Sequence, residues 1–289
     1  MFRKAERRKA KLRLAITGPA GSGKTYGALL IALGLGGQIA LIDTENGSGD
    51  LYADLCDYDV ANISAPYKIE KYINSIHEAE SAGYNVLIID SLSHAWSGEG
   101  GLLDVHSKMG GNSYAAWGKV TPLHNKLIET MLGSKCHIIA TMRTKTEYSM
   151  IQNASGKTEI KKIGLAPIQR EGMDYEFTVM FNLNMDHTVT VTKDRTRLFD
   201  RKNFVISQET GRILNNWLNK GSDSAINRND FKNTISRLYH EYLILFNNDS
   251  SAAQEVMQNI TNNKPSREWT QEDIKNLTQD LNDRLRAKN

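Results

Sequence analysis

The chain has 289 residues, of which 40% are hydrophobic and 24% are charged, and its formal net charge is +3. These values are typical of a globular protein with a full core, and no run approaches the roughly 18 apolar residues of a membrane span. Its two cysteines, Cys56 and Cys136, form no C-x-x-C pair, so neither a disulfide framework nor a zinc site is indicated. We therefore expect a cytoplasmic protein with no membrane partner.

Positive charge is concentrated in the first thirteen residues. Seven basic side chains stand against Glu6 there, a net +6, which leaves −3 for the remainder. Residues 1–13 are expected to form a basic arm that contacts a polyanion or an acidic neighbouring subunit. A solvated, frayed terminus is the alternative. The basic residues do not resemble a secretory signal.

A phosphate-binding loop follows the arm. The apolar run at Leu12, Leu14 and Ile16 predicts a strand, and the apolar residues after position 27 predict a helix. The glycines between them let successive amide groups point at a phosphate, next to the positive end of the helix. Lys24 would reach the β- and γ-phosphates of ATP, and the Thr25 hydroxyl would ligate Mg²⁺. The nucleotide-binding candidates are Gly18, Pro19, Ala20, Gly21, Ser22, Gly23, Lys24, Thr25 and the adjacent Tyr26.

Further strands are predicted at residues 38–42, 60–64 and 86–91, with a helix over residues 67–82. The first of these strands runs into Asp43, Thr44 and Glu45, at the carboxyl end where ligands bind in open α/β sheets. The continuous apolar run of the third is typical of a buried parallel strand. Asp90 near its end is the expected second Mg²⁺ anchor. His94 and Trp96, just beyond, either touch nucleotide or DNA or simply pack at the strand end.

The middle of the chain alternates predicted loops with regular elements. The five glycines of residues 97–113 favour a mobile loop, and residues 114–132 read as a helix despite Pro122. An apolar strand over residues 136–141 leads into Arg143. Residues 144–172 are polar, with a possible hairpin turn at 153–156, and are too long for an ordinary connection, so we expect them to be functional or disordered.

The last part of the core reads as two antiparallel strands, residues 175–183 and 188–192, followed by Lys193, Arg195 and a closing helix over 207–219. Residues 220–229 form a predicted linker, and residues 230–289 a helical C-terminal region. In this region Thr270 is a good N-cap, with Asp273 at the capping-box position. Its nearly balanced charges do not indicate a nucleic-acid site.

The order of these motifs resembles the RecA-like recombinase core over roughly residues 12–200. The run I-D-T-E-N-G-S-G-D-L-Y-A, residues 42–53, is similar to the segment that carries the family's water-activating Glu and adenine-contacting Tyr. The run L-I-I-D-S, residues 87–91, matches its Mg²⁺ strand. The resemblance implies an α/β fold over residues 14–219, with a mostly parallel central sheet flanked by helices. It assigns the catalytic base to Glu45 and base stacking to Tyr52. If Glu45→Gln hydrolysed ATP at the wild-type rate, Asp90 or Glu99 would be the next candidates for the base.

Two further runs extend the resemblance. The run I-I-A-T-M-R-T-K, residues 138–145, resembles the family's sensor strand, although Thr141 stands where the family normally offers a Gln. The run V-T-K-D-R-T, residues 191–196, resembles the paired cations that complete a neighbouring subunit's ATP site. This resemblance implies that Lys193 and Arg195 act in trans within a ring or filament.

Residues 97–113 and 144–172 fall where the family's two DNA-binding loops lie. The second stretch supplies basic side chains and an aromatic ring, a combination used to bind single-stranded DNA. The DNA-binding candidates are Lys145, Tyr148, Lys157, Lys161, Lys162 and Arg170.

Compact phage-encoded RecA-like ATPases of single-strand annealing are the nearest fit in size and motif wording, for example R-E-G-M-D-Y-E-F at residues 170–177. The resemblance implies a DNA-stimulated ATPase of phage recombination that forms homo-oligomers, with a single-strand-binding protein as a possible partner. An ATP-driven loader or motor of the replication machinery is the second hypothesis, and a small-molecule kinase is the third.

Overall fold

The computed structural model describes residues 4–152, 158–221 and 228–288. It divides the chain into two compact units, Met1–Ser222 and Asp223–Asn289. The first unit contains every residue of the expected nucleotide site, and the second contains the C-terminal helices. No helix within these ranges combines the length and apolar character that crossing a membrane requires.

The first unit is organised around a nine-stranded sheet in the order β3-β2-β4-β5-β1-β7-β8-β9, with β6 paired to β5 off this path. The pairs among β1, β2, β3, β4, β5 and β7 are parallel, whereas β8, β9 and β6 join antiparallel. This confirms the expected mostly parallel α/β sheet. The strands are β1 (Arg13–Gly18), β2 (Ile39–Asp43), β3 (Asp59–Asn62), β4 (Val86–Asp90), β5 (His137–Gln152), β6 (Thr158–Pro167), β7 (Val179–Leu183), β8 (Thr188–Asp194) and β9 (Phe204–Val205).

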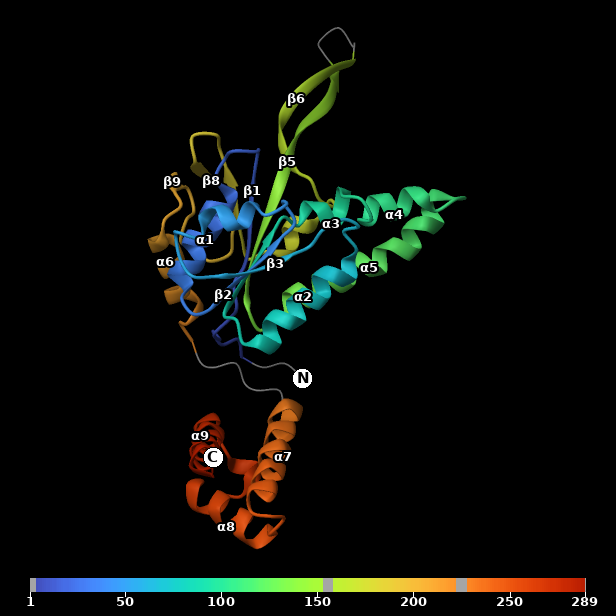
Figure 1. Cartoon of the computed structure of the whole chain (residues 1–289). Coiled ribbons are helices and arrows are strands. Elements are labelled where there is room, and N and C mark those ends of the chain that lie inside the picture. Colours follow the sequence, from blue (N-terminus) through green and yellow to red (C-terminus); the bar gives the residue numbers. More distant parts are fainter. Residues whose placement is uncertain (1–3, 153–157, 222–227, 289) are drawn as a thin grey trace. The chain divides into compact units, whose positions relative to one another are not determined.

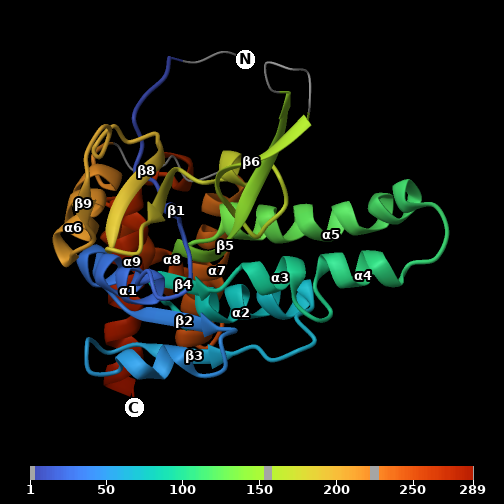
Figure 2. The ribbon, with the colours of Figure 1, turned by 90° about the horizontal axis from the view of Figure 1, so that it is seen from above.

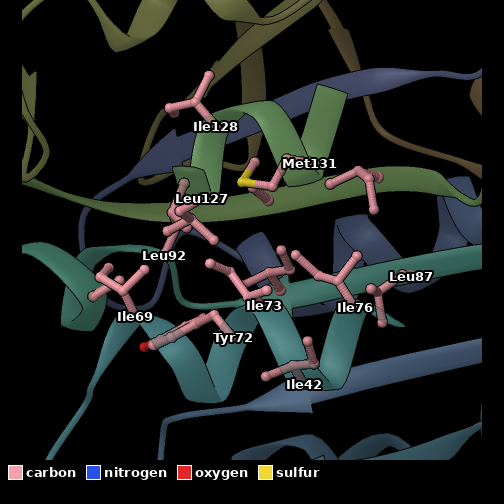
Figure 3. Packing of buried hydrophobic residues seen from close by; sticks show 14 of the residues in the cluster. Ile42, Ile69, Tyr72, Ile73, Ile76, Leu87, Leu92, Leu127, Ile128 and Met131 are labelled. Atoms are coloured by element: carbon pink, nitrogen blue, oxygen red, sulfur yellow. The ribbon is translucent and has the colours of Figure 1, made fainter. Parts of the chain in front are cut away.

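Helices cover both faces of this sheet (Figure 2). Helices α1 (Lys24–Leu35) and α6 (Gln208–Leu218) pack on one face. The other face is covered by α2 (Ile69–Ala82), α3 (Ser93–Ser97), α4 (Leu102–Lys108) and α5 (Ser113–Gly133). Figure 3 shows how Tyr72, Ile73 and Ile76 of α2 meet side chains of the strands and of α5. The parallel strands β1, β2 and β4 are therefore buried on both sides, which explains their continuous apolar runs, whereas β3 at the sheet edge is mostly exposed.

Residues 97–113 were expected to be a mobile loop, and this expectation is wrong for residues 102–108. Residues Leu102–Lys108 form α4, in which Leu102 is buried and Val105 packs against the same core. The carboxylate of Asp104 accepts hydrogen bonds from the Gly100 amide and from Lys108 Nζ, both at 2.7 Å. The glycines allow close approach: a Cβ on Gly100 would lie 2.4 Å from Pro66. Gly98 and Gly101 lie at equally close contacts, whereas a Cβ on Gly110 or Gly111 would meet nothing within 4 Å, so packing accounts for three of the five glycines.

Residues 144–172 contain a two-stranded ribbon that extends beyond the sheet (Figure 1). Strand β5 leaves the sheet and continues to Gln152, and β6 pairs with it antiparallel from Thr158 to Pro167. The expected turn at residues 153–156 lies outside the described residues. Tyr175, expected in a strand, lies instead in the 3-10 turn Met173–Glu176, because Gly172 takes φ +84° and turns the chain before β7 begins.

Two arginines of the expected basic arm are used inside the first unit. Arg13 opens β1, is only 6% exposed, and donates hydrogen bonds to the carbonyls of Leu12, Leu132, Ser134 and Cys136. Arg7 lies over the Trp217 ring of α6 at 3.9 Å and donates to carbonyls at the end of that helix. The interpretation of residues 1–13 as a separate arm is therefore wrong for these two side chains.

The second unit is helical, as expected. It contains α7 (Arg228–Leu245), α8 (Ser250–Ile260) and α9 (Gln271–Lys288), which share a small core that includes Leu238, Tyr242 and Leu277. The predicted capping box at the start of α9 is confirmed. The Thr270 amide donates to the Asp273 carboxylate at 2.7 Å, and the Asp273 amide donates to Thr270 Oγ1 at 3.3 Å.

Helices α1 and α6 approach so closely that two glycines are required at their crossing. A Cβ on Gly211 would lie 2.2 Å from the Ile31 carbonyl oxygen, and a Cβ on Gly34 would meet the Gln208 carbonyl oxygen. We predict that Gly211→Ala destabilises the protein by about 1–3 kcal/mol, as overpacking of a tight contact does. Urea denaturation of the full chain measures this change.

Gly118 is the matched control. It lies in the exposed middle of α5, and no atom lies within 4 Å of the Cβ that alanine would add. Gly118→Ala is expected to be neutral or to stabilise by roughly 0.5–1 kcal/mol, because alanine suits a helix interior better than glycine. Equal unfolding midpoints for the two variants would contradict the close crossing.

Candidate functional site

The phosphate loop joins β1 to α1 and is shaped by its own side chains. Gly21 and Gly23 adopt positive φ angles of 81° and 85°, which bulkier residues rarely take. Ser22 Oγ and Lys24 Nζ both donate to the Pro19 carbonyl, at 2.9 and 2.8 Å. The loop is thus already curled around the N-terminus of α1, where amide groups favour an anion.

Lys24 lies in a mixed electrostatic environment. Burial lowers the pKa of this lysine, while the carboxylates of Asp90 and Glu45 act to raise it. The positive charge of Arg143 also lowers the pKa of Lys24. The four charged groups therefore share one small region at the carboxyl edge of the sheet.

Asp90 is one of two buried carboxylates in this region, together with Asp43. It is 2% exposed at the end of β4 and accepts a hydrogen bond from Thr25 Oγ1 at 2.5 Å. On its other oxygen it accepts one from Thr141, which is fully buried on β5. Burial raises the pKa of Asp90, and the two hydroxyl donors oppose that rise. The structure thus brings together Thr25, Asp90 and Thr141, which were identified from separate parts of the sequence.

These donors fit magnesium. Mg²⁺ prefers a carboxylate, a hydroxyl, phosphate oxygens and waters to a full cage of protein ligands. In the described ranges, no group of three or more His, Cys, Asp and Glu side chains is arranged to hold a metal ion. Thr25 and Asp90 are the residues that would hold Mg²⁺ here, together with nucleotide phosphates.

Glu45 lies just beyond β2, in a turn that Asp43 stabilises. The buried Asp43 carboxylate accepts hydrogen bonds from the amides of Glu45 and Gly49. The side chain of Glu45 forms a two-pronged ion pair with Arg143, in which Arg143 Nε lies 2.8 Å from Oε1 and Nη2 contacts Oε2. Burial on its own would raise the pKa of Glu45, but the hydrogen bonds and charge of Arg143 lower it overall. Glu45 is therefore held ionised and oriented.

Sequence reasoning did not assign a role to Arg143. It follows the buried part of β5, and its amide is held by Ser93 Oγ at 3.0 Å. The sequence does show that Arg143 follows an apolar strand, which predicts that it lies at the same edge of the sheet as Glu45. The sequence does not show that the two side chains form an ion pair, because they lie 98 positions apart.

His94 belongs to the packing beneath this region. Its ring stacks on Tyr67 with centroids 4.7 Å apart, and its Nδ1 lies 2.7 Å from Thr44 Oγ1. The same Thr44 hydroxyl accepts the Ser91 amide at 2.8 Å. Burial lowers the pKa of His94, so the ring is neutral near pH 7. Of the two alternatives for His94, the packing contacts are the ones present in the structure.

A cavity of about 480 Å³ opens beside the phosphate loop. Tyr26 and Tyr52, both nucleotide-binding candidates, line one part of it, with ring centroids 5.9 Å apart. Apolar side chains at the ends of β7 and β9 complete the lining of the cavity: Leu183, Val205 and the adjacent Ile206. An apolar and aromatic lining next to a phosphate site suits a nucleobase.

His187 is a pocket residue that sequence reasoning missed. It lies in the turn between β7 and β8 with φ +65°, and its Nδ1 is 3.1 Å from the Ser22 carbonyl of the phosphate loop. In the sequence, His187 has no His or Cys at the spacing of a metal site, so nothing predicted that it lies beside the phosphate loop. The turn that carries it over the loop is set by the pairing of β7 with β8.

Among the described residues that line this cavity, neither Lys193 nor Arg195 is present. Lys193 Nζ donates to the carbonyls of Asp174 and Tyr175, at 2.6 and 2.8 Å, and Arg195 donates to the Tyr175 carbonyl at 3.2 Å. Within one chain these cations therefore hold the turn Met173–Glu176. Their expected action on a neighbouring subunit stays a prediction.

The DNA-binding candidates are spread along the ribbon and its return. Lys145 is exposed at the ribbon base, and Arg170 lies beyond its far strand, where its Nη2 lies 3.2 Å from Thr121 Oγ1. Tyr148, Lys161 and Lys162 lie on the ribbon backbone, but their side chains lie outside the described part. Lys157 falls outside it altogether.

The comparison with protein families agrees with this geometry. The family model described as an AAA domain matches residues 10–210, a range that contains the phosphate loop, Glu45, Asp90 and Arg143. No curated protein matches the chain. The chain belongs to this AAA domain family, and its first unit is a nucleotide-binding domain of the P-loop ATPase type.

Proposed function

We propose that the protein is a RecA-like ATPase that acts on single-stranded DNA in phage-type recombination or annealing. We further propose that it works as a homo-oligomer with nucleotide at subunit interfaces and with a single-strand-binding protein as a possible partner. The observation that carries this proposal is the course of β5. This strand places Thr141 against Asp90, places Arg143 against Glu45, and then continues into the ribbon. One strand thus joins the nucleotide site to a candidate DNA surface.

In the proposed hydrolysis, the amides of the phosphate loop and Lys24 bind and orient the phosphates of ATP. Glu45 Oε1 and Oε2 orient the attacking water and take up its proton. Because Arg143 lowers the pKa of Glu45, the carboxylate is ionised at neutral pH, and positioning contributes more than basicity. Mg²⁺ held by Thr25 and Asp90 would neutralise charge that develops on the phosphates.

The first test compares hydrolysis rates with and without single-stranded DNA. Wild-type protein is expected to hydrolyse ATP faster when single-stranded DNA is added. Glu45→Gln should still bind ATP but lose about 10² or more in hydrolysis rate, because the residue that activates water is gone. Lys24→Ala should lose ATP binding itself, because Lys24 is the phosphate-loop cation. Equilibrium binding of a fluorescent ATP analogue separates these two defects.

Several outcomes would contradict the proposal. Hydrolysis by Glu45→Gln at the wild-type rate would show that Glu45 is not the base. ATP hydrolysis that responds to a protein partner but not to DNA would favour an ATP-driven loader or motor. Phosphate transfer to a small acceptor in place of hydrolysis would favour a kinase.

The proposed subunit interface has its own prediction. The double variant Lys193→Ala/Arg195→Ala and the single variant Glu45→Gln should each be inactive alone, and mixing them should restore part of the activity. The reason is that a mixed interface combines an intact Glu45 with an intact cation pair, and a cation supplied in trans contributes roughly 10³–10⁵ in rate. ATPase activity of the mixture, measured against each variant alone, is the readout.

Dilution of wild-type protein is the control for this test. A shared site makes specific activity fall on dilution, because the interface dissociates. Specific activity that stays constant on dilution, with no recovery on mixing, would limit Lys193 and Arg195 to their contacts with the turn Met173–Glu176.

A further inference from the structure

An aromatic cleft lies between α3, α5 and the segment that follows the ribbon. The cavity there measures about 810 Å³. Three of its lining side chains are aromatic, one is basic and two are acidic. We name this site the tryptophan cleft, and its lining side chains are Trp96, Trp117, Tyr175, Arg170, Glu171 and Asp174.

The two indoles form a stacked platform. Trp96 of α3 and Trp117 of α5 lie with ring centroids 5.8 Å apart and planes inclined by 23°. Behind them, the His106 ring of α4 stacks on Trp117 at 4.1 Å, and His124 meets the edge of Trp96 at 5.9 Å. Both indoles are only partly buried against the main core. Ring contacts on several sides therefore fix the platform while part of it still borders the cavity.

The opposite wall is fixed as well. Tyr175 is 71% exposed, yet its turn is held by Lys193 and Arg195 through three hydrogen bonds to backbone carbonyls. Lys193 Nζ also lies 5.8 Å from the Tyr175 ring centroid. An exposed aromatic ring on a braced turn is preorganised to contact a ligand, because little conformational freedom is lost on binding.

The charges decide which ligand fits. The guanidinium of Arg170 already lies 5.8 Å over the Trp117 ring, so the chain itself supplies the cation of this platform. The positive charge of Arg170 would repel a cationic ligand, whereas it would attract the phosphate of a ligand that also carries a flat ring. Glu171 and Asp174 can accept hydrogen bonds from N–H groups of bases, such as the ring N3–H of thymine. The second cavity against the same segment is lined by Lys145, Arg170 and Lys193 as well as by the acidic Glu171 and Asp174, and the exposed Lys145 is the cation there that would meet phosphates.

We propose that the tryptophan cleft binds unpaired bases of single-stranded DNA, which stack on Tyr175 and pack against the indoles of Trp96 and Trp117, while Arg170 and Lys145 face the phosphates. Single-strand binders combine aromatic platforms with a basic track in this way. This inference rests on the proposed function for its choice of ligand. It differs from the ribbon hypothesis, because it places base contacts in the cleft and leaves only phosphate contacts to the ribbon.

The test measures binding of a fluorescein-labelled oligothymidylate to the full-length protein by anisotropy, with a non-hydrolysable ATP analogue, over a series of salt concentrations. Tyr175→Ala and Trp117→Leu should each weaken binding about tenfold, because each removes an aromatic ring that lines the cleft. Neither should change the slope of affinity against salt, because no phosphate contact is lost. The ribbon variant Lys157→Ala/Lys161→Ala/Lys162→Ala should instead flatten that slope.

Tyr114→Ala is the matched control. Tyr114 is 87% exposed at the start of α5 and does not line the cleft, so its removal should leave oligothymidylate binding at the wild-type level. Should Trp117→Leu fold poorly, Tyr175→Ala decides the question, because an exposed ring contributes little to stability.

Two negative results are distinguishable. If wild type binds the oligonucleotide and both cleft variants bind it as tightly as Tyr114→Ala does, the tryptophan cleft is not the base site, while the proposed function stands. If wild type binds no single-stranded DNA with or without nucleotide, both the cleft assignment and the proposed function fail.

Discussion

The site depends on one buried carboxylate, that of Asp90. Taking a carboxylate out of water is costly unless hydrogen bonds or a cation compensate. Here two threonine hydroxyls from α1 and β5 supply those hydrogen bonds, which ties the start of the loop helix to two neighbouring strands. Burial still raises the pKa of Asp90, so ionisation at neutral pH works against the folded state. A cation bound there would remove that penalty, which is the physical reason to expect Mg²⁺ at this position.

Strand β5 connects the surroundings of Asp90 to the surface of the protein. Parallel pairing of β5 with both β1 and β4 fixes Thr141 beside Asp90 and fixes Arg143 beyond it. Arg143 in turn holds Glu45 from β2, so three strands meet through two side-chain contacts. The ribbon lies further along β5, and Arg170 and Tyr175 of the tryptophan cleft follow it in the chain, whereas Trp96 and Trp117 belong to α3 and α5. A ligand on the ribbon would therefore contact the strand that holds both carboxylates.

Local features of the site could be predicted from the sequence. The phosphate loop, the apolar strand that ends in Asp90 and the capping box at Thr270 all depend on residues close together in the chain, and the structure shows each in the expected element. The pairing of Glu45 with Arg143 and the position of His187 could not be predicted. Both depend on strand order and on turns that bring distant segments together. The helix α4 was missed because the glycines on either side of it suggested a loop, although Gly98, Gly100 and Gly101 lie at close packing contacts.

The central claim is that Asp90 is the carboxylate around which a nucleotide–magnesium site is built. Calorimetric titration of ATP into Asp90→Asn and wild-type protein, each with and without Mg²⁺, tests it most directly. Asparagine keeps the size of the side chain and can still bond both threonine hydroxyls, so the fold should persist. The account predicts that Mg²⁺ strengthens ATP binding to wild type but leaves binding to Asp90→Asn unchanged. An equal strengthening by Mg²⁺ in both proteins would contradict it.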